Sequence, residues 1–144
     1  MMRIGFYGSD ADIDLWRAAL KTRLPSFEIA RLLDDAGQQC DVALVWAPPP
    51  GALSDCANLR GIIMQGQGVD HMRRDETVPR SVPLVRLVDP DISNALSHWA
   101  ILCALDFWRD ADHYRTAQAD RKWDPRSQRP ATGGQVGILG TGAI

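Results

Sequence analysis

Gly61-Ile62-Ile63-Met64-Gln65-Gly66-Gln67-Gly68-Val69-Asp70 joins a short apolar run to a glycine-rich turn. Its first four residues predict a short buried strand. Two glycines follow at once, at positions 66 and 68, and they free the backbone to turn its N–H groups outward as a small anion-binding nest. A carboxylate would suit that nest. A glycine-rich turn capped by Asp70, with no ligand, is the alternative interpretation, and the sequence leaves both open.

Further strands are predicted on both sides of this stretch. Val42–Trp46 is apolar throughout and ends abruptly at Pro48-Pro49-Pro50, where backbone donors are missing. The complete set of expected strands covers residues 3–7, 27–32, 42–46, 61–64 and 83–87. Continuous apolar strands that alternate with helical stretches are typical of a parallel sheet covered on both faces. We therefore expect an α/β fold, with residues 1–90 forming a doubly wound, five-stranded parallel domain.

Helical patterns occupy the segments between and after these strands. An amphipathic helix is expected from Ile13 to Leu24, and a short one over 53–59. The longest helix is expected to begin at a cap, Ser93 or Asn94, and to run to about His113. It is apolar nearly all round, which predicts burial at an interdomain or intersubunit contact. Residues 114–134 are polar and irregular and predict an arm that crosses a surface.

The last ten residues carry a second glycine pattern. Residues 135–139 predict a strand that runs into Gly140-Thr141-Gly142, the opening of the dinucleotide fingerprint G-x-G-x-x-G. Two glycines alone also fit a plain strand and turn. The acidic residue that selects NAD would lie about 20 positions later, past Ile144, so NADP and NAD both stay open. We expect residues 135–144 to be the first strand and turn of a truncated dinucleotide-binding domain.

Composition and charge exclude several classes of protein. The 144 residues are 45% hydrophobic and 24% charged, as in ordinary globular domains, and the formal charge of −2 gives no net basic field for nucleic acid. The longest apolar run, Trp99–Leu105, is far below the roughly 20 residues that a membrane span needs. Neither a membrane partner nor a signal peptide is expected. Cys40, Cys56 and Cys103 lack zinc-site spacing, which favours buried thiols, no metal and a cytoplasmic location.

Together, the stretches 66–70, 89–109 and 136–142, in this order and spacing, resemble the D-isomer-specific 2-hydroxyacid dehydrogenases. The resemblance is closest to the glyoxylate/hydroxypyruvate reductase A type, which residues 43–49 and 106–109 also resemble. It implies a flavodoxin-like substrate domain over 1–90, an interdomain helix and dimerisation arm over 91–134, and the start of a Rossmann domain over 135–144. It also implies a homodimer.

The resemblance implies roles for individual residues. Backbone N–H groups of Gln67 and Gly68, with Gly66, would hold the carboxylate of a small 2-oxoacid, and Trp46 would wall its pocket. Gly140 and Gly142 would take part in binding NADP or NAD. No catalytic residue is assigned in this chain, because the family's Arg, Glu and His are expected beyond Ile144. The implied reaction is reduction of glyoxylate or hydroxypyruvate by hydride from a nicotinamide, and the 144 residues alone are expected to be inactive.

Two non-catalytic alternatives remain. Residues 1–90 would also suit a flavodoxin-like binding module, although a phospho-receiver would need an acidic residue where Trp46-Ala47-Pro48 stands. A truncated dimerisation partner would suit the whole chain. His98 stands where many members of the family carry Glu; a satisfied, partly buried histidine explains it, and tuning of the interdomain contact is the alternative interpretation.

Overall fold

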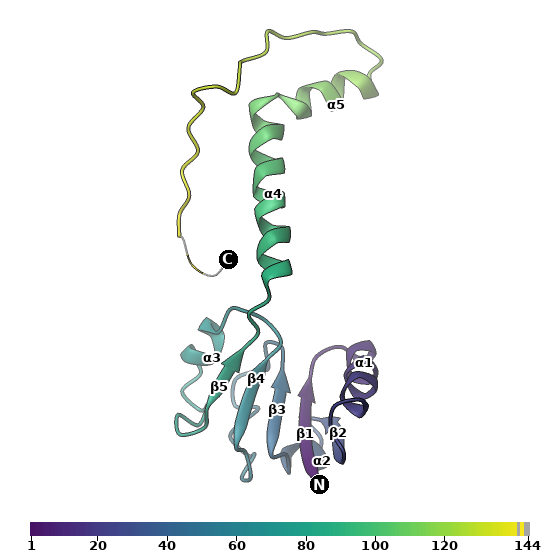
Figure 1. Ribbon diagram of the computed structural model, residues 1–144, viewed down its shortest axis with the longest axis vertical. Helices are drawn as coiled ribbons and strands as arrows, with labels where there is room; N and C mark the ends of the chain where they lie inside the picture. The colour runs from purple at the N-terminus through teal and green to yellow at the C-terminus, as the bar shows by residue number, and fades with distance from the viewer. Residues whose placement is uncertain (141, 143–144) are drawn as a thin grey trace. The chain divides into compact units, whose positions relative to one another are not determined.

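The computed structural model describes residues 1–140 and 142. The chain divides into two compact units, Met1–Val88 and Asp89–Ile144. Figure 1 shows the sheet of the first unit and the two helices of the second. Among the described residues, no helix combines the length and the apolar character needed to cross a membrane.

The first unit contains a five-stranded, all-parallel sheet. Its strands are β1 (Met2–Tyr7), β2 (Phe27–Arg31), β3 (Val42–Val45), β4 (Gly61–Met64) and β5 (Leu84–Arg86). Their order across the sheet is β2-β1-β3-β4-β5, and every neighbouring pair is parallel. The expected doubly wound fold is therefore confirmed. The order reverses between β1 and β3, and in such sheets ligands bind outside the carboxyl ends of the strands near the reversal.

Apolar side chains pack on both faces of the sheet. One core cluster comprises Ile4, Phe6, Ile13 and Leu44, where α1 (Asp10–Lys21) contributes Ile13. The opposite cluster includes Ala43, Val45, Ile62 and Met64. Leu44 and its two neighbours in β3 thus point to different faces, as the two-residue period of a strand requires. Both faces are covered, which explains why β3 is apolar throughout.

Helix α1 begins where the sequence places turn and cap residues. The Ser9 side chain accepts a hydrogen bond from Asp12 N at 3.3 Å, and Asp10 and Asp12 lie in the positive first turn of the helix. The Arg31 guanidinium forms an ion pair with Asp10, and this contact lowers the pKa of the Asp10 carboxyl. The ion pair therefore joins the start of α1 to the end of β2.

Two connections in the first unit differ from expectation. The helix expected over 53–59 is a series of turns, with Ala52 N bonded to Pro49 O at 3.1 Å and Ser54 N to Gly51 O at 3.0 Å. The preceding prolines supply no N–H donors, and Gly51 has a φ of +85°, so a regular helix does not form. Conversely, the polar connection after β2 forms α2 (Asp35–Gln38), and α3 (Asp70–Arg74) follows the glycine turn.

The second unit contains α4 (Pro90–Trp108) and α5 (Ala111–Ala119). The expected long helix begins earlier than predicted, because Asp89 is its cap: the Asp89 side chain accepts from Asp91 N at 2.9 Å, and Pro90 takes the first helical position. It also ends earlier, because Asp110 has a φ of +51° and interrupts the helical path. The part of the arm nearest the break is thus a second helix instead of irregular chain.

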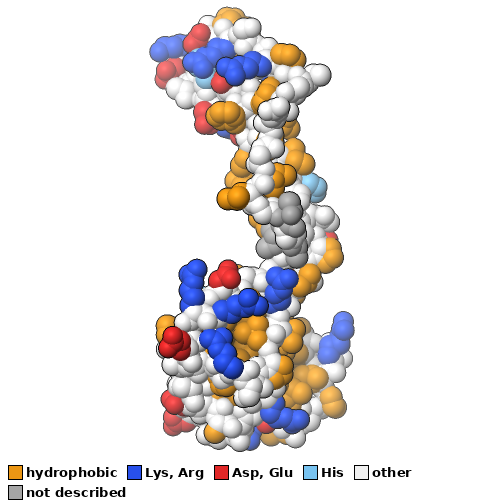
Figure 2. Space-filling view, turned by 90° about the vertical axis from the view of Figure 1, so that its left-hand side faces the viewer, with side chains coloured by type: hydrophobic (Ala, Val, Ile, Leu, Met, Phe, Trp, Pro, Cys, Tyr) orange, Lys and Arg blue, Asp and Glu red, His pale blue; other side chains and the backbone are white. Residues whose placement is uncertain are grey.

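Helix α4 buries none of its residues. Its exposed large apolar side chains are Ile92, Leu96, Trp99, Ile101, Leu102, Leu105 and Phe107. Figure 2 shows hydrophobic side chains in the part of the molecule that includes this helix. Cys103 also lies in α4 and is exposed, so the expectation of three buried thiols is correct only for Cys40 and Cys56.

Burial raises the pKa of the Cys40 thiol, and burial also raises the pKa of Cys56 to about 12. Both groups remain neutral thiols at neutral pH. They act as apolar packing residues in the core cluster that also contains Val45 and Ile62.

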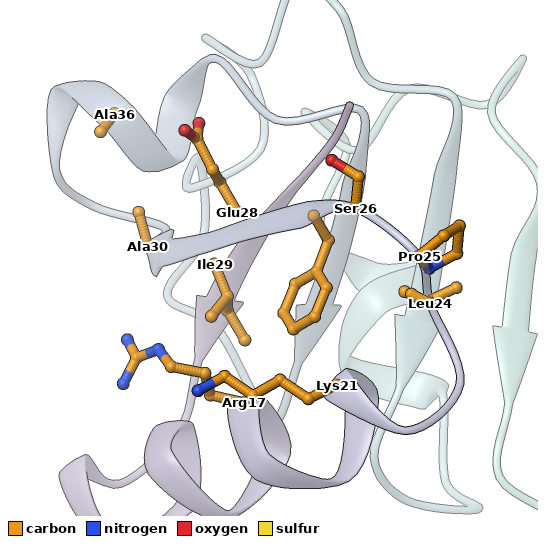
Figure 3. Close-up of a pocket in the computed structure, with 10 residues that line it drawn as sticks. Arg17, Lys21, Leu24, Pro25, Ser26, Glu28, Ile29, Ala30 and Ala36 are labelled. Carbon is orange, nitrogen blue, oxygen red and sulfur yellow. The ribbon is translucent and has the colours of Figure 1, made fainter.

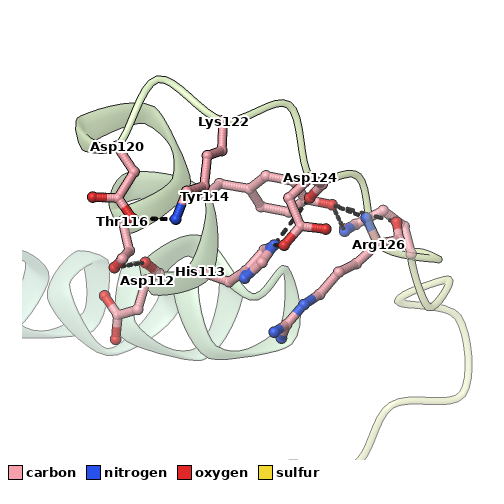
Figure 4. A network of polar contacts seen from close by, with 9 residues as sticks. Asp112, His113, Tyr114, Thr116, Asp120, Lys122, Asp124 and Arg126 are labelled. Atoms are coloured by element: carbon pink, nitrogen blue, oxygen red, sulfur yellow. Dashed lines mark hydrogen bonds and ion pairs between the residues drawn. The ribbon is translucent and has the colours of Figure 1, made fainter.

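The arm after α5 is tied to the helices by polar contacts (Figure 4). The His113 ring nitrogen Nε2 lies 2.9 Å from the carbonyl oxygen of Asp124, and the Tyr114 hydroxyl accepts from Arg126 N at 3.0 Å. The predicted strand over 135–139 is not formed: among the described residues no strand pairs with it, and Val136, Ile138 and Leu139 are exposed. A strand needs a neighbour to satisfy its backbone groups.

Candidate functional site

The carboxyl ends of β3 and β4 lie side by side. The parallel register pairs Val45 with Met64, so Trp46 and Gln65 leave the sheet next to each other. Trp46 N donates to Tyr7 O at 2.8 Å, and Gln65 N donates to Val45 O at 3.0 Å. These two bonds extend the ladder by one residue. They place the Trp46 side chain and the glycine turn at the same edge.

The Trp46 ring lies directly against Gly66. A Cβ at position 66 would overlap the Trp46 ring. Of the three ring atoms nearest to that Cβ, even the second and third, Cε3 and Cη2, would be only 3.1 Å away. Glycine is therefore required here for the close approach. The turn covers part of the ring, and 57% of the Trp46 residue remains exposed. The indole thus forms a wall beside the turn, with apolar surface available to a ligand.

The carbonyl groups of the glycine turn point toward the end of β5. Leu87 N donates to Met64 O at 3.1 Å and to Gly66 O at 3.3 Å, while Arg86 Nη1 donates to Gln67 O at 3.2 Å. A trans peptide unit is planar, so its N–H points opposite to its C=O. The N–H groups of Gln67 and Gly68 belong to the two peptide units whose carbonyls face β5, so both point away from β5.

Gln67 and Gly68 differ in their surroundings. The Gln67 side chain is buried, whereas Gly68 is exposed and a Cβ added to it would meet no atom within 4 Å. Gly68 does not have a positive φ, so the turn does not need glycine there for its conformation. Open space therefore lies beside Gly68, and two adjacent N–H groups on one side of a turn can hold the two oxygens of a carboxylate.

The structure brings four of the six candidate residues together. Trp46, Gly66, Gln67 and Gly68 meet at the carboxyl edge of the sheet, whereas Gly140 and Gly142 belong to the second unit. Gly140 has a φ of +93°, which suits a tight turn, but the described residues around it form neither a strand nor a helix. They therefore do not make a nucleotide site by themselves. Thr141 lies outside the described residues.

The sequence interpretation missed one residue at the edge, Arg86. It ends β5, and the register pairs it with Met64, the last residue before the turn. A basic residue at the end of the strand next to a glycine turn was the available signal. Helix and strand periodicity do not predict the contact of Arg86 with the glycine turn, because that contact depends on which strands are neighbours.

A hollow of about 650 Å³ lies elsewhere, along the outer edge of β2 (Figure 3). Arg17 and Lys21 of α1 border one side, and Glu28 and Ala36 lie on the other. Because β2 and β4 are separated by β1 and β3, this hollow is not part of the glycine-turn edge. Among the described residues, no group of three His, Cys, Asp or Glu side chains could hold a metal ion.

Comparison with known proteins identifies relatives along nearly the whole chain. Glyoxylate/hydroxypyruvate reductase A of Yersinia enterocolitica is 32% identical over 148 aligned positions, which cover 99% of this chain and 47% of the relative. The protein of the same name from Serratia proteamaculans is 31% identical with the same coverage. The chain thus spans about half the length of the curated relatives it matches. No family model matches the chain.

Solved structures agree with these relatives. A D-isomer-specific 2-hydroxyacid dehydrogenase from Xanthobacter autotrophicus Py2, in complex with NADPH and MES, has a TM-score of 0.78 at 30% identity and covers 99% of this chain. The NADPH-dependent glyoxylate/hydroxypyruvate reductase from Sinorhizobium meliloti, with NADP and sulfate, has a TM-score of 0.77 at 29% identity. This chain spans 47% and 45% of those two chains.

Proposed function

We infer that this chain is a part of a D-isomer-specific 2-hydroxyacid dehydrogenase, similar along its length to the glyoxylate/hydroxypyruvate reductases. We propose that residues 1–90 bind the substrate of an NADP(H)-dependent reductase of small 2-oxoacids, such as glyoxylate or hydroxypyruvate. Residues 91–134 would serve as the interdomain helix and dimerisation arm, and residues 135–144 would begin the nucleotide-binding domain.

The observation that carries this proposal is the pair of N–H groups on one side of the turn. The N–H groups of Gln67 and Gly68 would donate to the carboxylate oxygens, and charge-assisted bonds of this kind contribute on the order of 1.5 to 3 kcal/mol each. Trp46 would bound the pocket and limit the size of the substituent on the oxoacid. A carbonyl carbon held in this way would face hydride from a nicotinamide.

The nucleotide and the catalytic side chains belong to the proposal for the whole enzyme. The solved neighbours hold NADPH or NADP, which favours NADP(H) over NAD(H) as the hydride donor. The described residues near Gly140 form neither a strand nor a helix, so nucleotide binding would need further parts of the whole enzyme. By family resemblance, the Arg that polarises the carbonyl, the acid/base His and its Glu partner would come from sequence beyond Ile144.

Replacing Gly68 by valine is expected to weaken substrate binding without unfolding the chain. The position has open space and no positive φ, so the fold tolerates a side chain, but that side chain would occupy the region next to the Gly68 N–H. In an enzyme that joins residues 1–144 to a nucleotide-binding half, the KM for glyoxylate should rise at least about tenfold, equivalent to one lost charge-assisted bond.

The test measures NADPH oxidation with glyoxylate, together with the midpoint of urea unfolding. Gly61→Val is the matched control, because Gly61 begins β4, the strand that leads into the glycine turn, and also has open space around a Cβ. An unchanged KM in Gly68→Val would contradict the carboxylate cradle. Absence of any turnover in the unsubstituted extended enzyme would favour the non-catalytic binding or dimerisation module instead.

We further propose a cytoplasmic homodimer in which α4 is covered. The exposed apolar side chains of α4 support this proposal, since exposed apolar surface costs roughly 25 cal/mol per Å². The free Cys40, Cys56 and Cys103 fit a reducing compartment.

The double substitution Trp99→Glu and Leu102→Glu is expected to shift the 144-residue chain from a self-associated species toward a monomer. Each change places a charge on the apolar surface of α4, and a charge is costly to bury at an interface. Light scattering after size exclusion should give more than 15.9 kDa for the unsubstituted chain and a value close to 15.9 kDa for the variant. The double substitution Ser93→Glu and Ser97→Glu adds the same charge to α4 and serves as the control. A monomeric unsubstituted chain would contradict the proposal.

A further inference from the structure

Arg86 acts on the peptide unit that carries one of the two proposed donors. Its Nη1 donates to the carbonyl oxygen of Gln67 at 3.2 Å, and the same peptide unit contains the Gly68 N–H. Because the unit is planar, holding the carbonyl toward β5 holds the N–H in the opposite direction. The hydrogen bond also polarises the unit, which makes the N–H a stronger donor.

The position of Arg86 is set by the sheet. It is the last residue of β5, it pairs with Met64 of β4, and the next residue, Leu87, binds the carbonyls of Met64 and Gly66 through its own N–H. Backbone hydrogen bonds therefore hold the beginning of the turn. The side chain of Arg86 holds the turn further along, at Gln67. Among the described residues, no carboxylate forms an ion pair with Arg86, so its positive charge is available to the turn.

We propose that Arg86 is a positioning residue for carboxylate binding: it orients and polarises the Gln67–Gly68 peptide unit so that the Gly68 N–H faces the ligand. This inference rests on the proposed function, because it assumes that the turn holds a substrate carboxylate. It assigns no proton transfer or bond cleavage to Arg86. A guanidinium suits the role because its planar fork of donors is held in one geometry, unlike the rotating ammonium of lysine.

The experiment uses the 144-residue chain labelled with ¹⁵N and titrated with oxamate, an unreactive 2-oxoacid analogue with one carboxylate. In the unsubstituted chain, the amide signals of Gln67 and Gly68 should shift and saturate. In Arg86→Met, the dissociation constant for oxamate should rise about tenfold, in line with the loss of a charge-assisted interaction. In the same variant without ligand, the chemical shift of the Gly68 amide nitrogen should also differ from that in the unsubstituted chain, because the carbonyl of its peptide unit has lost a hydrogen-bond donor.

Arg80→Met is the matched control. Arg80 also donates from a guanidinium to a backbone carbonyl, that of Arg73 at 2.9 Å, and its replacement removes the same charge from the same unit. We expect oxamate affinity to be unchanged in this variant. Equal losses in Arg80→Met and Arg86→Met would reduce the effect to net charge and overturn the positioning role. Arg86→Lys should recover only part of the affinity, because it keeps the charge and loses the fork.

The outcomes separate the two proposals. If oxamate does not change the chemical shifts of the Gln67 and Gly68 amides in the unsubstituted chain, the carboxylate cradle is wrong, and so is the positioning role of Arg86. If oxamate binds there and Arg86→Met binds it equally well, the cradle stands and only the positioning role is wrong. Urea unfolding of each variant completes the test: a loss of affinity in Arg86→Met with an unchanged unfolding midpoint supports positioning, and a loss matched by general unfolding contradicts it.

Discussion

Replacing Gly37 by alanine is expected to destabilise the first unit strongly. Gly37 lies in α2, and a Cβ there would overlap the carbonyl oxygen of Arg31 and come within 2.8 Å of Leu32 Cα. Both neighbours are backbone atoms at the end of β2, so no side-chain rotation can relieve the overlap. Backbone would have to move, and β2 or α2 would lose its place beside β1.

We expect the free energy of unfolding to fall by at least about 3 kcal/mol, the upper range for overpacked positions. Urea unfolding followed by circular dichroism measures this change. Gly61→Ala is the control, because a Cβ at Gly61 would meet no atom within 4 Å. A Gly37→Ala chain that unfolds at the same urea concentration as the unsubstituted chain would show that α2 does not pack against β2 as described.

A polypeptide of these 144 residues is expected to show no reduction of glyoxylate by NADPH or NADH. The proposed cradle supplies binding, but hydride transfer to a carbonyl also needs a positioned nicotinamide and an acid to protonate the developing alkoxide. The described residues near Gly140 form no nucleotide site. At the carboxyl edge of the sheet, the groups proposed to act are backbone donors, the Trp46 indole and Arg86, and none of these is a general acid for the alkoxide. Turnover should equal that of buffer.

The measurement follows NADPH absorbance with glyoxylate and records the intact mass of the same sample. An extended enzyme that contains a nucleotide-binding half is the positive control, and it should restore turnover. Saturable turnover from a species with the mass of 144 residues would contradict the assignment of catalysis to sequence beyond Ile144. Turnover from a heavier species would show that the sample contains more than this chain.

Much of the first unit could be predicted from sequence because its signals are local. The strand over 61–64 has the predicted bounds, and each of the other four strands differs from prediction by one residue at one or both ends. Apolar runs bounded by proline and glycine are sufficient for this, since a strand covered on both faces must be apolar at consecutive positions. The cap at Asp89 was missed although Pro90 follows it, because Ser93 and Asn94 offered an equally good local cap.

Local sequence patterns were thus sufficient for the parallel doubly wound class and for the place of the glycine turn at the end of the fourth strand, and the family resemblance pointed to Trp46, Gly66, Gln67 and Gly68 as candidates. Which of these residues touch, and what orients them, followed only from the folded chain. The close approach of the Trp46 ring to Gly66, and the hydrogen bond from Arg86 to Gln67 O, join residues about 20 positions apart. Such contacts depend on strand order and register, which arise from pairing across the sheet and leave no periodic pattern in any one segment.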